Sequence, residues 1–248
     1  MKSAQKYFLA LCLFLFASYG CAPAKCEKGC LRILFIGNSY TFVNDLPHTF
    51  AKLASSGKHQ VQVGMFAQPG WSLADHVQSA EMLDTLQSSK WDYAIVQEQS
   101  EFPAVEAARN QVTYPAARAL VGKIRDAGSN PIFFQTWAHR DGLPENGLTN
   151  FEAMQYEIDM GYLGIAQELG VPIAPVGDAW FNALTQNPQL QLWQADGSHP
   201  TEQGTYLAAC VFYAVIFNES PQGLSYAGNV NAEIANQLQA VAAQNVLP

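Results

Sequence analysis

The sequence has little positive charge: 13 Lys and Arg residues stand against 21 Asp and Glu residues, which gives a formal net charge of −8 over 248 residues. A surface of that sign repels phosphate backbones and anionic lipid headgroups, so it argues against nucleic-acid binding and against membrane adhesion through a basic patch. Acidic substrates are disfavoured for the same reason. Phosphate-binding glycine loops are missing as well, because neither Gly-x-Gly-x-x-Gly nor Gly-Lys-Ser/Thr occurs.

Long apolar runs are also scarce. One of them, Tyr7 to Ala17, follows two lysines near the N-terminus and is too short to span a bilayer comfortably, which is typical of a secretory signal. We therefore expect export. Residues 18–21 resemble a bacterial lipoprotein box, which favours cleavage before Cys21 and attachment of lipid to that residue, whereas a small-residue site at 22–24 is the alternative. Residues 1–20 are thus predicted to be the signal, 21–30 a short leader and 31–248 a single domain.

The five cysteines differ in the roles that their positions predict. Cys12 would leave with the signal, and Cys21 would carry the lipid. Cys26 and Cys30 flank a short loop, where they would form a disulfide in an oxidising compartment or remain free thiols in the leader. Their spacing, with no histidine nearby, is a poor zinc pattern, and we expect no metal. Cys210 lies in an apolar helical stretch and is predicted to pack in the core.

After residue 30, short apolar segments alternate with longer amphipathic ones. The short segments are rich in Val, Ile and Phe, which predicts buried strands at Leu31–Ile36, Val61–Phe66, Tyr93–Val96, Pro131–Phe134 and Val171–Pro175. The longer segments have helical periodicity and fall at Leu46–Ser56, Leu73–Ser88, Val105–Ala127, Asn150–Leu169, Thr201–Asn218 and Asn231–Asn245. Strands that alternate with helices predict an α/β domain with a five-stranded parallel sheet covered on both faces.

Chemistry in such a sheet gathers at the carboxyl ends of the strands, and the first of these ends carries a serine. Ser39 follows the first apolar strand and a Gly37-Asn38 turn, with a helix after it. A serine there can stand in the crevice, and its own N–H can point at a developing oxyanion. The same pattern is also typical of a plain turn with a capping residue, so it does not establish catalysis by itself.

A second informative segment lies far downstream, at residues 194–201. A nucleophilic serine needs a base, and that base needs a carboxylate to fix its tautomer. His199 and Asp196 supply both from one loop, and Pro200 and Thr201 then begin a helix that anchors it. Taken alone, Asp196 is equally a turn residue and His199 a surface residue.

Together the two segments resemble the SGNH superfamily, also called the GDSL-like lipases and acylhydrolases. Asn38 stands where many members have Asp, and the order of elements matches over residues 31–218. The resemblance implies a flavodoxin-like, three-layer α/β/α fold. It also implies that Ser39 is the nucleophile, that His199 is its base, oriented by Asp196, and that no metal or organic cofactor is used.

The same resemblance implies an oxyanion hole with two further donors. Gly70 follows the second strand and matches the family glycine, although Pro-Gly is also a simple turn. The usual Gly-x-Asn-Asp after the third strand is absent, and Gln97, Glu98 and Gln99 stand there instead, a spelling closer to the sialate and xylan acetylesterase branch. We predict Gln97 as the third donor because it is nearest the strand end, with Gln99 as second choice; an amide donates without titrating.

Several aromatic and polar side chains are candidates for binding substrate: Asn38, Tyr40, Trp71 and Trp137, with Glu101, His139 and Arg140 in the same region. They follow strand ends that open onto one edge of the sheet, and aromatic rings with amides suit sugars. For Trp137 the alternative is core packing, and for His139 and Arg140 it is an ordinary loop.

We therefore predict an exported serine esterase, lipid-anchored through Cys21, that removes small O-acyl groups, acetyl on carbohydrate above all. The expected partner is a small-molecule or glycan ester, with no nucleic acid, and with membrane contact only through the N-terminal lipid. A lipase, lysophospholipase or thioesterase would use the same triad, and an acyltransferase would pass the acyl group to a sugar. A surface glycan-binding lipoprotein without catalysis is the alternative outside the enzymes.

Overall fold

The computed structural model describes residues 29–248. The predicted signal, Cys21 and Cys26 lie outside these residues, so secretion, lipidation and the pairing of Cys26 stay predictions. Cys30 is disulfide-bonded, and Cys210 is a free, buried thiol. Over 29–248, none of the helices combines the length and the apolar character needed to cross a bilayer.

Five parallel strands form one sheet in the order β2-β1-β3-β4-β5. They are β1 (Leu31–Gly37), β2 (Val61–Ala67), β3 (Tyr93–Val96), β4 (Asn130–Gln135) and β5 (Ile173–Pro175). The predicted α/β class and the five-stranded parallel sheet are therefore confirmed. The last strand begins two residues later than expected, because the N–H of Val171 donates to the carbonyl of Ala166 and still belongs to the turn that ends the preceding helix.

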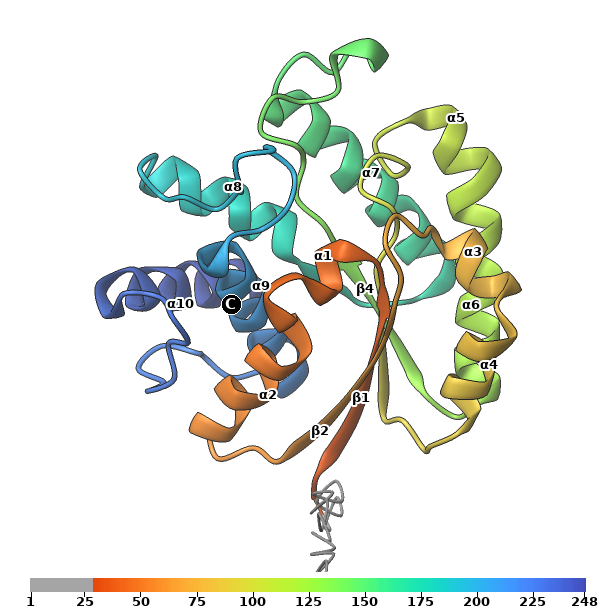
Figure 1. The fold of residues 1–248 in the computed structure, drawn as a ribbon, viewed down its shortest axis with the longest axis horizontal. Helices are drawn as coiled ribbons and strands as arrows, with labels where there is room; N and C mark the ends of the chain where they lie inside the picture. The colour runs from red at the N-terminus through yellow and green to blue at the C-terminus, as the bar shows by residue number, and fades with distance from the viewer. Residues whose placement is uncertain (1–28) are drawn as a thin grey trace, which may run out of the picture.

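Helices cover both faces of this sheet (Figure 1). One side carries α2 (Leu46–Ser56), α8 (Val176–Gln186), α9 (Glu202–Phe217) and α10 (Ala232–Val246). The other carries α3 (Leu73–Gln78), α4 (Ala80–Gln87), α5 (Glu106–Ala108), α6 (Tyr114–Asp126) and α7 (Phe151–Leu169). The central strand β1 is sealed between these layers, since Ile33 to Ile36 are at most 1% exposed. An unbroken apolar strand is what burial on both faces demands.

Two predicted helices are interrupted. The segment 73–88 is split at Ser79, whose backbone is extended (φ −79°, ψ 114°) and whose hydroxyl caps α4 by accepting from the N–H of Met82. Serine is favoured as the capping residue at the start of a helix and disfavoured in a helix interior. The segment 105–127 contains a π-helical turn at Arg109–Thr113 between α5 and α6. Helix α8 was not predicted, because it follows β5 directly, with no turn residues to separate them.

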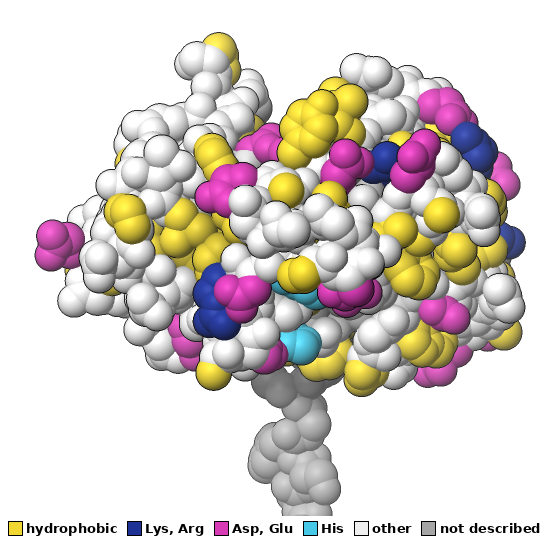
Figure 2. Space-filling model, turned by 90° about the horizontal axis from the view of Figure 1, so that it is seen from above, with side chains coloured by type: hydrophobic (Ala, Val, Ile, Leu, Met, Phe, Trp, Pro, Cys, Tyr) yellow, Lys and Arg dark blue, Asp and Glu magenta, His cyan; other side chains and the backbone are white. Residues whose placement is uncertain are grey.

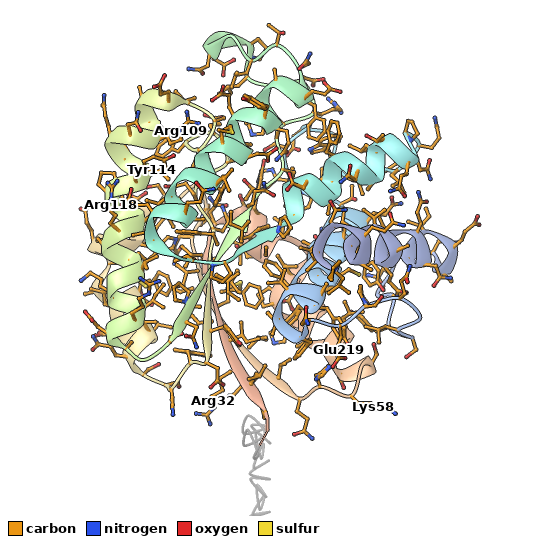
Figure 3. The ribbon with its side chains drawn as sticks, turned by 180° about the vertical axis from the view of Figure 1, so that it is seen from behind. Arg32, Lys58, Arg109, Tyr114, Arg118 and Glu219 are labelled. Carbon is orange, nitrogen blue, oxygen red and sulfur yellow. The ribbon has the colours of Figure 1, made fainter. Side chains whose placement is uncertain are left out.

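The π turn sits where side chains reach across to α7 (Figure 3). Arg109 donates to the carbonyls of Pro103 (3.1 Å) and Glu157 (2.9 Å), and Tyr114 donates to the carbonyl of Gly161 (3.1 Å). A side chain at Gly161 would collide with the Pro103 carbonyl, so glycine permits this close approach. These contacts fix the loop that follows β3 against α7.

The order of strands determines where a site can form. Connections from β1 lead to β2 on one side, and later strands add on the other side, so the direction of winding reverses between β1 and β3. Ligands in open α/β sheets bind at such a reversal, beyond the carboxyl ends of the strands. The segments 38–42 and 97–101 both begin at that point.

Candidate active site

Ser39 stands at the start of α1 (Ser39–Phe42), directly after β1. Asn38 caps this short helix, because its Oδ1 accepts from the N–H of Tyr40 at 3.1 Å. The turn is tight: a Cβ at Gly37 would overlap Gln97 and Thr41. On its other side the Gly37 carbonyl accepts from Nε2 of His76 (2.9 Å), a buried imidazole whose pKa burial lowers and which therefore stays neutral. The backbone turn that carries the serine is thus fixed by packed groups.

The three predicted triad residues lie in contact. Nε2 of His199 is 2.9 Å from Oγ of Ser39, and Nδ1 of His199 is 2.6 Å from Oδ2 of Asp196. The first of these contacts joins residues 160 positions apart in the chain, and the second joins residues three positions apart. The order serine, imidazole, carboxylate is the one needed to remove the serine proton and to stabilise the imidazolium that results.

Asp196 is held ionised by its own turn. Its Oδ1 accepts from the N–H groups of Ser198 and His199, both at 3.0 Å. Burial raises the pKa of Asp196, but these hydrogen bonds and the contact with the His199 ring outweigh that effect, so the pKa is lowered overall. The carboxylate can therefore orient the imidazole without taking its proton.

The loop that carries His199 is held in place by hydrogen bonds from neighbouring side chains and backbone. The carbonyl of Pro200 accepts from the side chains of Asn44 and Gln194, both at 3.0 Å, and the His199 carbonyl accepts from the N–H of Gln194 at 2.8 Å. Asn44 adopts a left-handed backbone (φ 54°), which is unusual for a residue other than glycine. That conformation aims its amide at the loop, and the bracing sets the height of the imidazole above the serine.

Two backbone N–H groups of residues that line the pocket are candidates for binding an oxyanion. Ser39 and Gly70 both line the pocket, and neither N–H has an acceptor within residues 29–248. Gly70 adopts φ +71°, a region that favours glycine, and its loop is tied down by Asn38, whose Nδ2 donates to the Trp71 carbonyl at 3.0 Å. Free donors in this arrangement suit an oxyanion.

The structure does not place Gln97 where the third donor is needed. Gln97 is fully buried; its Oε1 accepts from the N–H of Asn38 (2.9 Å) and from the hydroxyl of Thr41 (2.9 Å), and its Nε2 donates to the carbonyl of Glu98. The amide is consumed in holding the serine turn. The prediction for Gln97 is wrong for this physical reason, and the second choice, Gln99, lines the pocket instead.

Gln99 has its donor free. Its Oε1 accepts from the N–H groups of Glu101 (2.7 Å) and Phe102 (3.1 Å), which closes the following turn, and its Nε2 has no acceptor in the described part of the chain. Glu98 fixes its backbone, because Oε1 of this buried carboxyl accepts from the N–H of Gln99 (2.7 Å) and of Leu73 (2.9 Å). One buried group thus ties the loops after β2 and β3 together. The sequence could not distinguish Gln97 from Gln99, because both are glutamines near the same strand end. Only their contacts in the structure distinguish them.

The aromatic candidates divide between pocket and core. Tyr40 borders the pocket, and burial raises the pKa of its hydroxyl, which contacts Oγ of Ser198 at 2.7 Å. Trp137 is fully buried beneath it, stacked on the Tyr40 ring at 4.5 Å and on Trp180 at 4.2 Å. The substrate role predicted for Trp137 is therefore wrong: its ring supports Tyr40, and its Nε1 donates to the carbonyl of Ser198 at 2.9 Å.

Of the other predicted binding residues, Asn38 borders the pocket but spends its side chain on internal contacts. Trp71 packs against Phe66 and His76 and is not part of the lining. The pocket itself has a volume of about 590 Å³. Sequence reasoning missed six of its lining residues, which are Phe42, Val43, Pro69, Ser100, Gln194 and Ser198. No pattern marked them as pocket residues, since they lie beside the predicted catalytic residues or, like Ser198, between them.

Seen from the carboxyl end of the sheet, this face of the molecule has few positive side chains, and histidine and acidic side chains lie next to each other near its centre (Figure 2). This agrees with the acidic composition. A negatively charged substrate would meet unfavourable potentials there, so a neutral ester suits the pocket better.

A second pair of carboxyls lies at the same edge of the sheet but outside this pocket. Asp159 accepts from the side-chain amides of Gln135 (2.9 Å) and Gln155 (2.7 Å), and Asp178 lies beside it. Burial raises the pKa of Asp159 to about 7; the Asp178 charge adds to the rise and the Gln155 hydrogen bond opposes it. The Asp159 carboxyl therefore releases its proton only near neutral pH.

This pair should make stability depend on pH. The pKa of Asp159 is higher in the folded protein than in the unfolded chain, so its stabilising contribution is complete below about pH 4 and is lost as the pH rises through about 7. We expect the free energy of unfolding to fall by on the order of 4 kcal/mol over that range. Asp159→Asn should remove this fall, measured by urea unfolding at pH 5 and pH 8. Asp84→Asn, on an exposed face of α4, is the matched control; equal pH slopes in wild type and Asp159→Asn would contradict the prediction.

Known proteins of similar structure indicate the superfamily that this chain resembles. No family model matches the sequence, and no curated protein matches it. Several solved structures match the chain. A protein from Slackia heliotrinireducens, described as a candidate SGNH hydrolase, is 27% identical over 75% of this chain and 99% of its own, with a TM-score of 0.63. A DUF4886 family protein from Bacteroides uniformis is 21% identical over 88% of this chain and 95% of its own, with a TM-score of 0.77.

A third similar structure is Axe2, an acetylxylan esterase from Geobacillus stearothermophilus. It is 16% identical over 73% of this chain and 92% of its own, with a TM-score of 0.56. The fold and the site together define an α/β/α protein with a serine, a histidine and an aspartate at the carboxyl edge of a parallel sheet. The chain is similar in fold and in site to the SGNH hydrolases, the superfamily that its two sequence segments resemble.

Proposed function

We propose that the protein is an exported serine esterase that removes small acyl groups, acetyl in particular, from carbohydrate. The observation that carries this proposal is the unbroken contact from Asp196 through His199 to Ser39, beside two N–H groups without acceptors. The similarity to an acetylxylan esterase supports the substrate class. Export and lipid attachment at Cys21 rest on the N-terminal sequence alone.

In the proposed reaction, His199 Nε2 takes the Ser39 proton while Oγ attacks the ester carbonyl. The N–H groups of Ser39 and Gly70, with Nε2 of Gln99, then bind the tetrahedral oxyanion. Collapse breaks the C–O bond, His199 gives its proton to the leaving alcohol, and an acyl-serine remains. Water then attacks the acyl carbon as it loses a proton to His199. The second collapse breaks the bond between that carbon and Ser39 Oγ, which takes the proton from His199 as the acid leaves. Asp196 stabilises the imidazolium in both halves of the cycle.

The lining of the pocket supports the proposal of a short acyl chain. Its apolar lining comes from Phe42, Val43 and Pro69, while hydroxyl and amide groups make up much of the rest. Three apolar side chains can cover a methyl group, but they offer too little surface to bury a long alkyl chain, at about 25 cal/mol per Å² of apolar area removed from water.

The test is hydrolysis of p-nitrophenyl acetate, butyrate and octanoate by the purified protein, together with labelling by a fluorophosphonate. We expect acetate to be the preferred ester and the label to attach to Ser39. Preference for octanoate would favour a lipase or thioesterase, which the same triad can serve. No turnover and no labelling by folded protein would favour the alternative of a glycan-binding protein without catalysis.

A further inference from the structure

A wall of hydroxyl groups borders the pocket next to the nucleophile. Tyr40, Ser100 and Ser198 all contribute to the lining. The Tyr40 hydroxyl contacts Oγ of Ser198 at 2.7 Å and also interacts with the Ser100 hydroxyl. The proposed reaction uses none of these three groups.

A second histidine stands behind this wall. Nε2 of His139 is 3.2 Å from Oγ of Ser100, and the backbone N–H of His139 donates to the sulfur of Met154 at 3.3 Å. Ser100 is 9% exposed, so only its edge faces the pocket. The triad histidine has both ring nitrogens engaged by Asp196 and Ser39, so His139 is not a spare member of the triad.

His139 is suited to bind a neutral group. Burial lowers the pKa of its ring, and the nearby carboxylates of Glu101, Glu145 and Asp196 offset this only in part. A neutral imidazole has one donor and one acceptor nitrogen, and a serine hydroxyl both donates and accepts. The pair can therefore donate to a ligand hydroxyl or accept from it, whereas a lysine or arginine would select for negative charge.

We propose that Ser100 and His139 form a subsite for the leaving alcohol, binding a sugar hydroxyl next to the acylated one. The proposal rests on the proposed function and names its substrate class. The hydroxyl groups of a polyol both donate and accept, and so do the hydroxyl groups that line this side of the pocket. Nitrophenyl esters have no such hydroxyl, so they would gain nothing from this subsite.

The test uses the full protein with two acetyl esters, p-nitrophenyl acetate and an acetylated xylo-oligosaccharide. We expect Ser100→Ala and His139→Gln each to lower kcat/KM for the sugar ester about 10-fold, mainly through KM, which is the size of one hydrogen bond to substrate. With p-nitrophenyl acetate the change should stay within about twofold. Because the two residues act together, the double variant should lose little more than either single one.

Ser100→Thr keeps the hydroxyl and should restore most of the activity toward the sugar ester. His59→Gln changes a histidine that contacts Glu219, outside the pocket, and serves as the control. Equal losses on both esters would mean that the pair only supports the fold, and no loss on the sugar ester would mean that it binds nothing; either outcome overturns the subsite. Wild-type protein that cleaves neither ester would refute the proposed function instead.

Discussion

Ser39→Ala should lower kcat for p-nitrophenyl acetate by at least about 10³-fold, and His199→Ala should do the same. The serine supplies the atom that bonds to the acyl carbon, and the imidazole is the base in contact with it, at 2.9 Å. Removing both together should cost little more than removing one, because each depends on the other. The measurement is kcat under saturating ester, corrected for spontaneous hydrolysis.

Both variants should fold. The Ser39 hydroxyl has His199 as its hydrogen-bond partner, so its removal costs about 1 kcal/mol of stability at most. The chain offers matched controls: Ser56→Ala removes a hydroxyl bonded to the Leu53 carbonyl in α2, and His48→Ala removes an exposed histidine paired with Asp45 at 2.8 Å. Both controls should keep full activity. Residual activity near wild type in Ser39→Ala or His199→Ala, with controls unchanged, would disprove the triad.

The pair formed by Asp45 and His48 also shows what the sequence can and cannot predict. Asp-x-x-His occurs twice, at 45–48 and at 196–199, and both pairs are in contact. Only the second reaches Ser39. The resemblance predicted the second pair, from the neighbouring Pro200 and the helix that follows it. The distance to the serine is a property of packing between elements 160 residues apart, which no local pattern contains.

The fold class was predictable because continuous apolar segments and amphipathic ones differ in periodicity, and periodicity is local. The boundaries of the helices were less predictable. Ser79 breaks one predicted helix because a hydroxyl can cap the next, and α8 begins at Val176 with no turn before it. Trp137 shows the same limit for the site: an aromatic residue after a strand can face a pocket or the core, and the stack with Trp180, in the unpredicted α8, decides for the core.

Gln97 and Gln99 show the limit most clearly, and they lead to the second large effect. When β1 ends, the N–H of Asn38 loses its strand partner, and the Gln97 side chain supplies the acceptor at 2.9 Å. Its neighbour Gln99 is left to face the pocket with a free Nε2. We expect Gln99→Ala to lower kcat about 10²-fold with little change in KM, because an oxyanion donor acts only in the transition state.

Gln99→Glu separates the donor from the turn that Gln99 also closes. Glutamate keeps an oxygen for the N–H groups of Glu101 and Phe102, so the loop should remain closed, but it replaces the Nε2 donor with a negative oxygen. Repulsion of the oxyanion should then make the loss in kcat larger than in Gln99→Ala, about 10³-fold. Gln186→Glu, at an exposed position near the end of α8, controls for the added charge. If Gln99→Glu kept the wild-type kcat while its melting temperature was unchanged, the oxyanion would be held by the two backbone N–H groups alone, and the amide would have no part in catalysis.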